Sequence, residues 1–364
     1  MAAVQAPERR PRASAALDYP LAAPAADGSV VEVAPGVLWA RMPMPMALDH
    51  INVWLLRGEA GWTIVDTGLA TPDVRALWEK IAAAHLDGLP IERLVCTHFH
   101  YDHAGLAAWI TQRFGVPLSM TMGEFLTMRL LGDPLPDPVP PELDRHYRAA
   151  GVPADRRARI FETLRRDPFM PPRQGDYVRL RDGDELAIGS RRWRVVIGEG
   201  HSPEHACLYS AEDRLLIAGD QLLPRISSNV LVPAHEPEAN PLQLWLDSLA
   251  KLDRLAPDTL VLPSHQGVFR GLHARVAELR EHHRHQLDSL RRFVAEAGEC
   301  SAFEAMSGLF PRLRSTFDEM LAIGETIAHL TWLRHNAALQ RRLDDEGIFR
   351  FSATADQDSA EVHW

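Results

Sequence analysis

The 364-residue sequence predicts a mixed α/β fold followed by a mainly helical C-terminal region. Three observations carry this prediction. Short apolar segments typical of buried strands alternate with amphipathic helical segments from Val30 to about Gly271. Beyond Gly271, apolar residues follow a helical period almost to the end of the chain. Hydrophobic residues make up 46% of the chain, which is enough to form a sizeable core.

Strands and helices alternate through the first part of the chain. The sequence predicts strands in VVEVAPGVLWARM, HINVWLLRG, GWTIVDTG and IERLVCTH. A helix is expected to follow Thr71, because Thr71 can cap it and Pro72 suits its first position. A helix in AGLAAWITQRFG is expected to end at Gly115. From about 120 to 174, prolines interrupt short helical segments. This insertion has two alternative interpretations: a lid or binding segment, or an insertion without a function of its own.

Strands resume after the insertion. They are predicted in DYVRLRDGDELAIG, RRWRVVIGEG, ACLYS, RLLIAGD and TLVLPSH, and NPLQLWLDSLAKLDRL is predicted as a helix capped by Asn240. Helices are then expected in LHARVAELREHHRHQLDSLRRFVAEAG, SAFEAMSGLF and IGETIAHLTWLRHNAALQRRL, and GIFRFSA is expected to be a strand. The run EHHRHQ is expected to lie on a solvated helix face. Helices followed by a small β element favour a winged-helix-like module.

These patterns divide the chain into four parts. We expect a flexible segment over residues 1–28, a catalytic domain over 29–270, the winged-helix-like module over 271–353 and a frayed tail over 354–364. No apolar run of about 18 residues and no secretory signal is visible, so we expect a soluble cytoplasmic protein without a membrane span. Three cysteines give no disulfide framework. The net charge of −10 disfavours broad binding to nucleic acid or anionic membranes.

A dense cluster of metal-ligand types occurs in THFHYDHAG, directly after a predicted buried strand. His98 and His100 would project from the same side of an extended segment, and Asp102 and His103 follow as the chain turns towards a helix. Imidazole and carboxylate bind zinc, and they also bind manganese and iron. Four candidate ligands exceed what one structural zinc draws from so short a span. The pattern therefore makes two metals plausible, provided that other segments supply ligands.

Three further strand ends supply such ligands. GHSPEH follows one strand and contains His201 and His205, a second strand ends at Asp220, and a third ends at His265. Each residue alone is more typical of a loop without function. Together with the first cluster they predict a single metal centre where the strands end.

At these residues the sequence resembles the metallo-β-lactamase superfamily, through VDTG, THFHYDH, GHSPEH, AGD and PSH in that order. The resemblance covers about residues 30–271 and implies an αββα sandwich with a two-metal site at the edge between the sheets. It implies that one metal takes His98, His100 and His201, that the other takes Asp102, His103 and His265, and that Asp220 bridges them. Asp66 and His205 would support the site without binding metal. Glu204 departs from the glycine common at that position.

The resemblance implies hydrolysis by a water that two divalent metal ions activate, with zinc expected first and manganese or iron as alternatives. Asp102 would hold this nucleophile and take its proton. We expect the substrate to be a small thioester, ester or lactone. An endoribonuclease or phosphodiesterase is the first alternative, and a non-hydrolytic metal-binding or redox protein is the second. Tyr101, Tyr147, Asn229 and His235 are the candidate residues of the substrate rim.

The C-terminal part is similar to the branch of this superfamily with a winged-helix-like tail, which includes lactamase-like endoribonucleases and glyoxalase II-like relatives. The similarity lies in AHLTWLRHNAALQRRLDDEGIFRF. This part carries no basic excess, although Arg334, Arg341 and Arg342 are able to form a small basic patch. A packing or dimerisation module is therefore favoured over a nucleic-acid-binding one, and the expected partners are a small-molecule substrate and a second copy of the chain.

Overall fold

A computed structural model describes residues 17–46, 48–166 and 175–354. Seven strands form its first sheet, in the order β1-β2-β3-β4-β5-β6-β7. They are β1 (Val30–Ala34), β2 (Val37–Pro43), β3 (His50–Arg57), β4 (Trp62–Val65), β5 (Ile91–Val95), β6 (Leu118–Thr121) and β7 (Val178–Leu180). Pairing is antiparallel from β1 to β4 and parallel from β4 to β7. The carboxyl ends of β4 and β5 therefore lie at the same sheet edge.

A second, five-stranded sheet has the order β12-β11-β10-β9-β8. Its strands are β8 (Glu185–Ile188), β9 (Arg191–Gly198), β10 (His205–Ser210), β11 (Leu215–Gly219) and β12 (Leu260–Pro263). Strands β11 and β12 are parallel, and the other pairs are antiparallel. Trp39, Trp54 and Trp193 are buried in one hydrophobic cluster contributed by strands of both sheets. The two sheets are therefore packed face to face.

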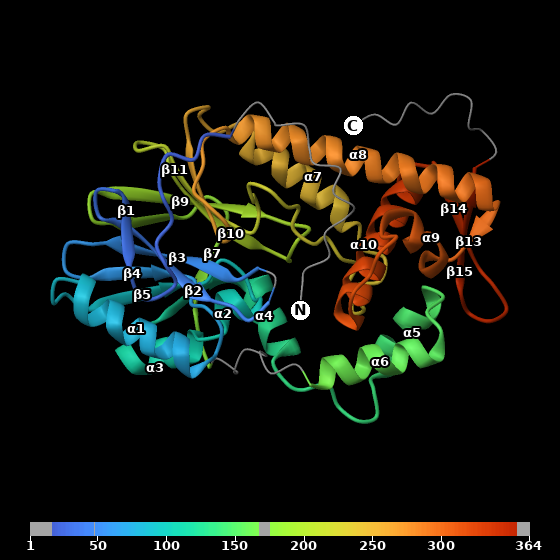
Figure 1. The fold of residues 1–364 in the computed structure, drawn as a ribbon, viewed down its shortest axis with the longest axis horizontal. Helices are drawn as coiled ribbons and strands as arrows, with labels where there is room; N and C mark the ends of the chain where they lie inside the picture. Colours follow the sequence, from blue (N-terminus) through green and yellow to red (C-terminus); the bar gives the residue numbers. More distant parts are fainter. Residues whose placement is uncertain (1–16, 47, 167–174, 355–364) are drawn as a thin grey trace.

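Helices cover the outer faces of both sheets. The first sheet is covered by α1 (Pro72–His85), α2 (Tyr101–Ala104), α3 (Ala107–Phe114) and α4 (Met122–Leu131), and the second by α7 (Pro241–Leu252) and α8 (Leu272–Ala297). Figure 1 shows α1 and α3 on one side of the two sheets and α7 and α8 on the other. This arrangement confirms the αββα sandwich.

Local signals account for most of the helix ends. Thr71 caps α1, because its side chain accepts a hydrogen bond from Val74 N at 3.3 Å. Gly115 ends α3 in the left-handed conformation, at φ 67°. Asn240 precedes α7 as expected, but its side chain makes no capping hydrogen bond. The sequence therefore predicted where α7 begins but not how its first amides are satisfied.

The C-terminal module runs from α8 through β13 (Glu299–Cys300), α9 (Ala302–Leu309), α10 (Thr316–His335), β14 (Leu339–Leu343) and β15 (Phe349–Ala353). The last strands form a sheet in the order β13-β15-β14. Helix, strand, two helices and a hairpin follow one another, which confirms a mainly helical C-terminal region with a small β element. The helix expected through Leu343 ends earlier, because the chain reverses at Ala337 (φ 56°) and residues 339–343 pair with β15.

The insertion extends this module. It contains α4, α5 (Pro141–Ala149) and α6 (Ala154–Arg165), and α5 and α6 lie beside α9 and α10 in Figure 1. Tyr147 and Phe161 are buried in the same hydrophobic cluster as residues of α8, α9 and α10. Phe303 N donates a hydrogen bond to Ala150 O at 2.9 Å. The second half of the insertion is therefore packed against the C-terminal module.

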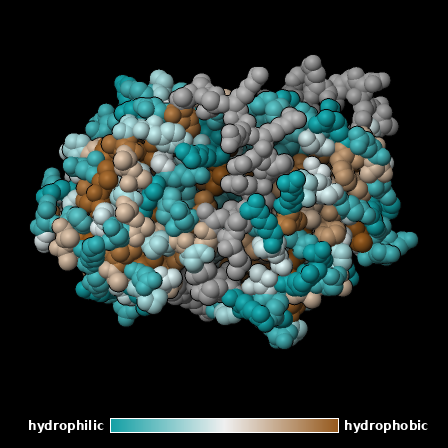
Figure 2. Space-filling view, viewed as in Figure 1, coloured by the Kyte–Doolittle hydropathy of each residue, from teal (hydrophilic) through white to brown (hydrophobic). Residues whose placement is uncertain are grey.

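Part of the segment expected to be flexible is packed. Leu17 belongs to the core shared with α8, and Asp18 pairs with Arg270 through backbone hydrogen bonds. Residues 1–16 of that segment, residues 167–174 of the insertion and the tail from 355 lie outside the described residues. Among the helices that the structure describes, none is long and apolar enough to cross a membrane. Figure 2 shows a mostly hydrophilic face with separate hydrophobic patches.

Candidate metal centre

The candidate ligands gather at strand ends of both sheets. Asp66 follows β4, and the segment from Thr97 to His103 follows β5. From the second sheet, Asp220 follows β11 and His265 comes two residues after β12, while His201 lies between β9 and β10. The structure brings the seven predicted ligands together in two groups of donor atoms.

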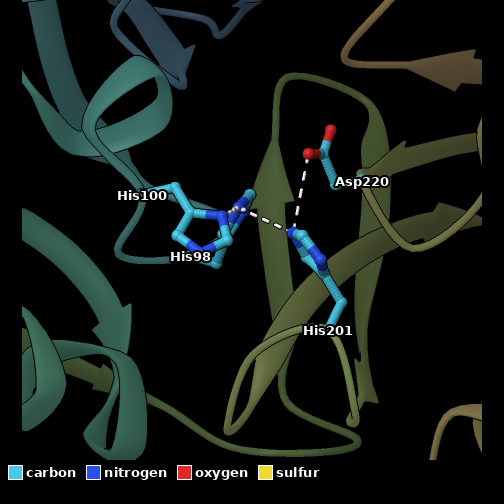
Figure 3. Close-up of side chains that lie close together, drawn as sticks. All are labelled: His98, His100, His201 and Asp220. Atoms are coloured by element: carbon cyan, nitrogen blue, oxygen red, sulfur yellow. Dashed lines mark hydrogen bonds and ion pairs between the residues drawn. The ribbon is translucent and has the colours of Figure 1, made fainter. Parts of the chain in front are cut away.

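The first donor group consists of His98, His100, His201 and Asp220, whose donor atoms all lie within 4.8 Å of one another. His98 Nε2 is 2.8 Å from His100 Nδ1 and 3.3 Å from His201 Nε2. His201 Nε2 is 3.5 Å from Asp220 Oδ2. In Figure 3 the imidazoles of His98 and His100, which lie on one segment, face the His201 imidazole and the Asp220 carboxylate from two other segments.

The second donor group consists of Asp102, His103 and His265, all buried. Asp102 Oδ2 is 3.6 Å from His103 Nε2 and 3.4 Å from His265 Nε2. Asp220 lies against this group as well, with Oδ2 at 3.6 Å from His103 Nε2 and Oδ1 at 3.4 Å from His265 Nε2. The Asp220 carboxylate therefore faces both donor groups.

These spacings fit metal ions better than hydrogen bonds. Ligand bonds of about 2.0–2.1 Å in a tetrahedron place neighbouring donor atoms about 3.3 Å apart. Most of the separations described above are 3.3–3.6 Å, beyond good hydrogen-bond length. His103 Nε2 and Asp220 Oδ1 are also buried without a hydrogen-bond partner. Such orphaned buried atoms are costly unless something binds them, so the residues fit divalent metal ions.

Hydrogen bonds to Nδ1 orient three of the imidazoles. His103 Nδ1 donates to Asp66 Oδ2 at 2.9 Å, His265 Nδ1 donates to His50 O at 2.9 Å, and His201 Nδ1 donates to Asn229 O at 2.8 Å. Because each acceptor holds a proton on Nδ1, Nε2 is the nitrogen of each ring that is left to bind a metal ion. Asn229 therefore contributes through its backbone carbonyl.

Asp66 connects β4 to the ligand segment. Its backbone is in the left-handed region (φ 63°), which is uncommon for a residue other than glycine. Its carboxylate accepts hydrogen bonds from Thr97 N at 2.8 Å and Thr97 Oγ1 at 2.9 Å, besides the one from His103. One buried carboxylate thus fixes both the start of the segment and one of its imidazoles.

His205 is buried behind the first donor group. Its Nε2 accepts a hydrogen bond from Asp220 N at 3.1 Å, so this nitrogen is not available to a metal ion. A Cβ on Gly219 would lie only 2.3 Å from the His205 ring, which explains why glycine precedes Asp220. His205 therefore holds the Asp220 backbone.

Glu124 joins the two ligand-bearing segments, a role that the sequence did not predict. Its carboxylate, fully buried on α4, accepts hydrogen bonds from Phe99 N at 3.0 Å, Ser202 Oγ at 2.6 Å and Glu204 N at 2.8 Å. Burial raises the pKa of Glu124 to about 7, although these hydrogen bonds oppose the rise. The available signal was a carboxylate on the same helix face as the buried Phe125 and Met128.

Glu204, the residue that departs from the family pattern, secures the same junction from the other side. Its carboxylate accepts a hydrogen bond from Gly123 N at 2.7 Å, at the N-terminus of α4. Its carbonyl accepts a hydrogen bond from Thr121 Oγ1 at 2.8 Å. Glu124 and Glu204 thus tie α4 and the segment around His201 together reciprocally.

The carboxylates of the metal centre raise the pKa of two of its buried imidazoles. Burial alone would lower the pKa of His265, but Asp220 and Asp102 outweigh it and raise that pKa to about 10. The pKa of His103 is likewise raised well above its ordinary value against the effect of burial, mainly by Asp102, Asp66 and Asp220. Metal ions must therefore displace protons from these two imidazoles.

The candidate rim residues occupy different environments. Tyr147 is buried against Phe161, which favours packing over substrate contact. Tyr101 is half-buried beside the core under the first sheet. The side chains of Asn229 and His235 are exposed, in the segment that follows Asp220. Of the four candidates, Asn229 and His235 are thus the most exposed.

The fold and the donor groups agree with the comparison with known families. Residues 46–265 match the metallo-beta-lactamase superfamily, and residues 287–354 match the metallo-beta-lactamase-like C-terminal domain. The first match covers more than half of the chain. The chain therefore belongs to the metallo-beta-lactamase superfamily. Its relatives include hydrolases, and it is itself a metallo-hydrolase.

Three similar proteins illustrate the relationship. A crystal structure of a beta-lactamase domain protein from Burkholderia ambifaria is 43% identical, with a TM-score of 0.86, over 93% of this chain and 98% of that one. The probable metallo-hydrolase YqjP of Bacillus subtilis (strain 168) is 28% identical over 83% of this chain and 93% of the relative. The acyl-coenzyme A thioesterase MBLAC2 of Gallus gallus is 29% identical over 51% of this chain and 62% of the relative.

Proposed function

We propose that this protein hydrolyses a small thioester, with esters and lactones as related substrates, at a centre of two divalent metal ions, zinc before manganese or iron. The observation that carries the proposal is the Asp220 carboxylate, which faces two buried donor groups at once. Two ions held side by side supply an activated water and Lewis acidity at a carbonyl oxygen when bound.

The residues of this chain would perform the remaining tasks. Asp102 is buried beside His103 and His265, and its carboxylate has a second oxygen with which to orient a water and accept its proton. The two donor groups consist of histidine and aspartate, and a water activated by metal ions would be the nucleophile, so no side-chain nucleophile is required. Asn229 and His235 would line the entry for the substrate.

The choice of a thioester rests on a relative rather than on the donor groups. The same ligands can serve carboxyl esters, lactones, β-lactams and phosphodiesters, because they act on the water and the carbonyl or phosphoryl oxygen. MBLAC2, which matches half of this chain, is an acyl-coenzyme A thioesterase. A thioester is therefore the first substrate class to test.

A substrate panel tests this proposal. Metal-loaded protein is assayed with acyl thioesters, lactones, aryl esters, a β-lactam, a phosphodiester and RNA, with Asp102→Asn as the inactive reference. We expect the highest kcat/KM on a thioester and a loss of at least 100-fold in Asp102→Asn. Faster turnover of RNA or the phosphodiester would overturn the thioester assignment.

The charges of the C-terminal module disfavour RNA. Arg334 and Arg341 both pair with Glu238, at 2.9 and 2.7 Å, and Arg342 pairs with Glu299, with Nε at 2.7 Å. Three arginines that the sequence offered as a basic patch are thus each engaged with a carboxylate. A small-molecule substrate is the better proposal.

A further inference from the structure

The segment after Asp220, here called the 221–232 loop, shapes two members of the first donor group. Asn229 O accepts the hydrogen bond that orients His201. Ser228 Oγ donates to Asp220 O. Whatever fixes this loop therefore also fixes a ligand imidazole and a ligand carboxylate.

Arg275 of α8 holds the near end of the loop. Its side chain is only 7% exposed, Nε donates to Leu223 O at 2.6 Å, and Nη2 donates to Ile226 O at 2.9 Å. Nη1 lies 3.1 Å from a carboxylate oxygen of Glu278. A planar guanidinium that donates to two carbonyls fixes their relative position, which a single flexible donor cannot do.

His283 and His329 hold the loop at its centre. In EHHRHQ, expected to lie on a solvated face, Glu281 and His285 are exposed, but His283 is fully buried. His329 Nδ1 lies 2.8 Å from Glu325 O, which can only accept, so Nδ1 carries the proton. Burial lowers the pKa of His329 to about 4, so the ring is neutral and its Nε2 accepts from His283 Nδ1 at 3.1 Å. His283 Nε2 then accepts from Ser227 Oγ at 3.0 Å. The chain of hydrogen bonds thus runs in one direction, from the loop into the module.

This chain does not make Ser227 a nucleophile. A serine is activated by a base that can accept its proton and by a third group that stabilises the resulting imidazolium. Burial and the neighbouring His329 hold the pKa of His283 well below its ordinary value, and the chain ends on a backbone carbonyl. The same geometry is suited to fixing the loop.

The far end of the loop packs on α10. A Cβ on Gly324 would lie 2.9 Å from Leu231 Cδ2, so the absence of a side chain at Gly324 lets Leu231 approach the helix closely. The loop thus contacts α8 and α10 at three successive points: Arg275, the His283–His329 pair and Gly324. Each contact is independent of the metal ligands themselves.

We propose that the C-terminal module positions the metal centre: Arg275 and His283 act through the 221–232 loop as positioning residues for His201 and Asp220. The module is thereby part of the hydrolytic machinery without touching substrate. The inference rests on the metal centre of the proposed function, but it does not depend on whether the substrate is a thioester.

Chelator competition on the full chain tests this inference without a substrate. Affinity for Zn²⁺ is measured for Arg275→Gln and Ser227→Ala, with Arg280→Gln as the matched control, because Arg280 lies on the same helix with its side chain 44% exposed. We expect both test variants to bind Zn²⁺ about ten-fold more weakly, the low end of what supporting residues cost, and the control to match the wild type.

Activity and stability separate positioning from folding. At saturating Zn²⁺ we expect kcat to return towards the wild-type value while KM stays unchanged. Ser227→Ala removes only one hydroxyl group. This variant therefore still tests the inference if Arg275→Gln does not fold. Wild-type Zn²⁺ affinity in Ser227→Ala, or a lower melting temperature in either variant without weaker Zn²⁺ binding, would overturn the inference. If the protein does not hydrolyse thioesters, the Zn²⁺ affinities still test this inference. That result would contradict only the proposed substrate class.

Discussion

Asp66 determines which nitrogen of His103 is free. Its Oδ2 accepts the His103 Nδ1 proton, and the unpartnered Nε2 of that ring faces Asp102 and Asp220. A carboxylate can only accept here, so it selects one tautomer of the imidazole. The tautomer, rather than any direct bond to metal, is the contribution of Asp66.

Asp66→Asn is therefore expected to weaken metal binding. If the amide nitrogen faces His103 Nδ1, the proton is driven to Nε2 and that nitrogen loses its lone pair. We expect metal affinity to fall between about 10- and 100-fold in chelator competition. Asp87→Asn is the matched control, because Asp87 shares the left-handed backbone (φ 51°) but lies in an exposed ion pair with Arg57. Unchanged metal affinity in Asp66→Asn would contradict the assigned role.

At the scale of elements, α4 acts as a junction between the two sheets. Its first turn holds the segment after β5 through Phe99 N and the segment before β10 through Ser202 and Glu204. These two segments carry His98 and His100 on one side and His201 on the other. The spacing of the first donor group therefore depends on one buried carboxylate.

Replacing Glu124 by glutamine should loosen this junction. A glutamine keeps one acceptor oxygen, while its amide nitrogen would face either Phe99 N or the pair of donors from Ser202 and Glu204. We expect metal affinity to drop about ten-fold, with a smaller loss of stability. Glu79→Gln, in an exposed pair with Arg113, serves as the comparison. If both variants bound metal equally well, α4 would have only a structural role.

The sequence predicts the candidate metal ligands better than the residues that hold these ligands in place. The seven candidate ligands lie in short motifs at strand ends, where apolar runs mark the preceding strands. Glu124 and His283 lie in helices outside these motifs, and their roles depend on partners from 25 to 80 residues away. Helical periodicity places His283 on a helix, but it does not predict which other helix packs against this residue. The strand at 339–343 was missed because its pairing with β15 overrides a helix-favouring composition.

At the scale of the molecule, the centre links stability to pH when no metal is bound. The folded-state pKa of His265 is raised to about 10 and that of His103 is raised well above its ordinary value. Their unfolded-state value is about 6.5. The folded form therefore binds more protons between these values. The resulting stability is fully present below about pH 6.5 and is lost as pH rises towards 10.

Urea unfolding of chelator-treated protein checks this expectation. We expect its free energy of unfolding to fall between pH 6.5 and about 7.5, below the pKa of about 8.5 at which exposed thiols of the unfolded chain ionise. Metal binding requires deprotonated imidazoles, so metal-loaded protein should not show this fall and should bind metal more tightly as pH rises. If the free energy of unfolding of the metal-free protein rose over the same pH range, the raised pKa values of His265 and His103 would be contradicted.

The central claim is that two donor groups sharing Asp220 form one hydrolytic metal centre. Titration of metal-free protein with Zn²⁺, following bound metal and thioester hydrolysis in the same samples, tests it most directly. We expect hydrolysis to reach its plateau at about two bound ions per chain, and to be abolished together with tight binding in His98→Ala. Full hydrolysis in the presence of chelator, with no metal bound, would contradict the account.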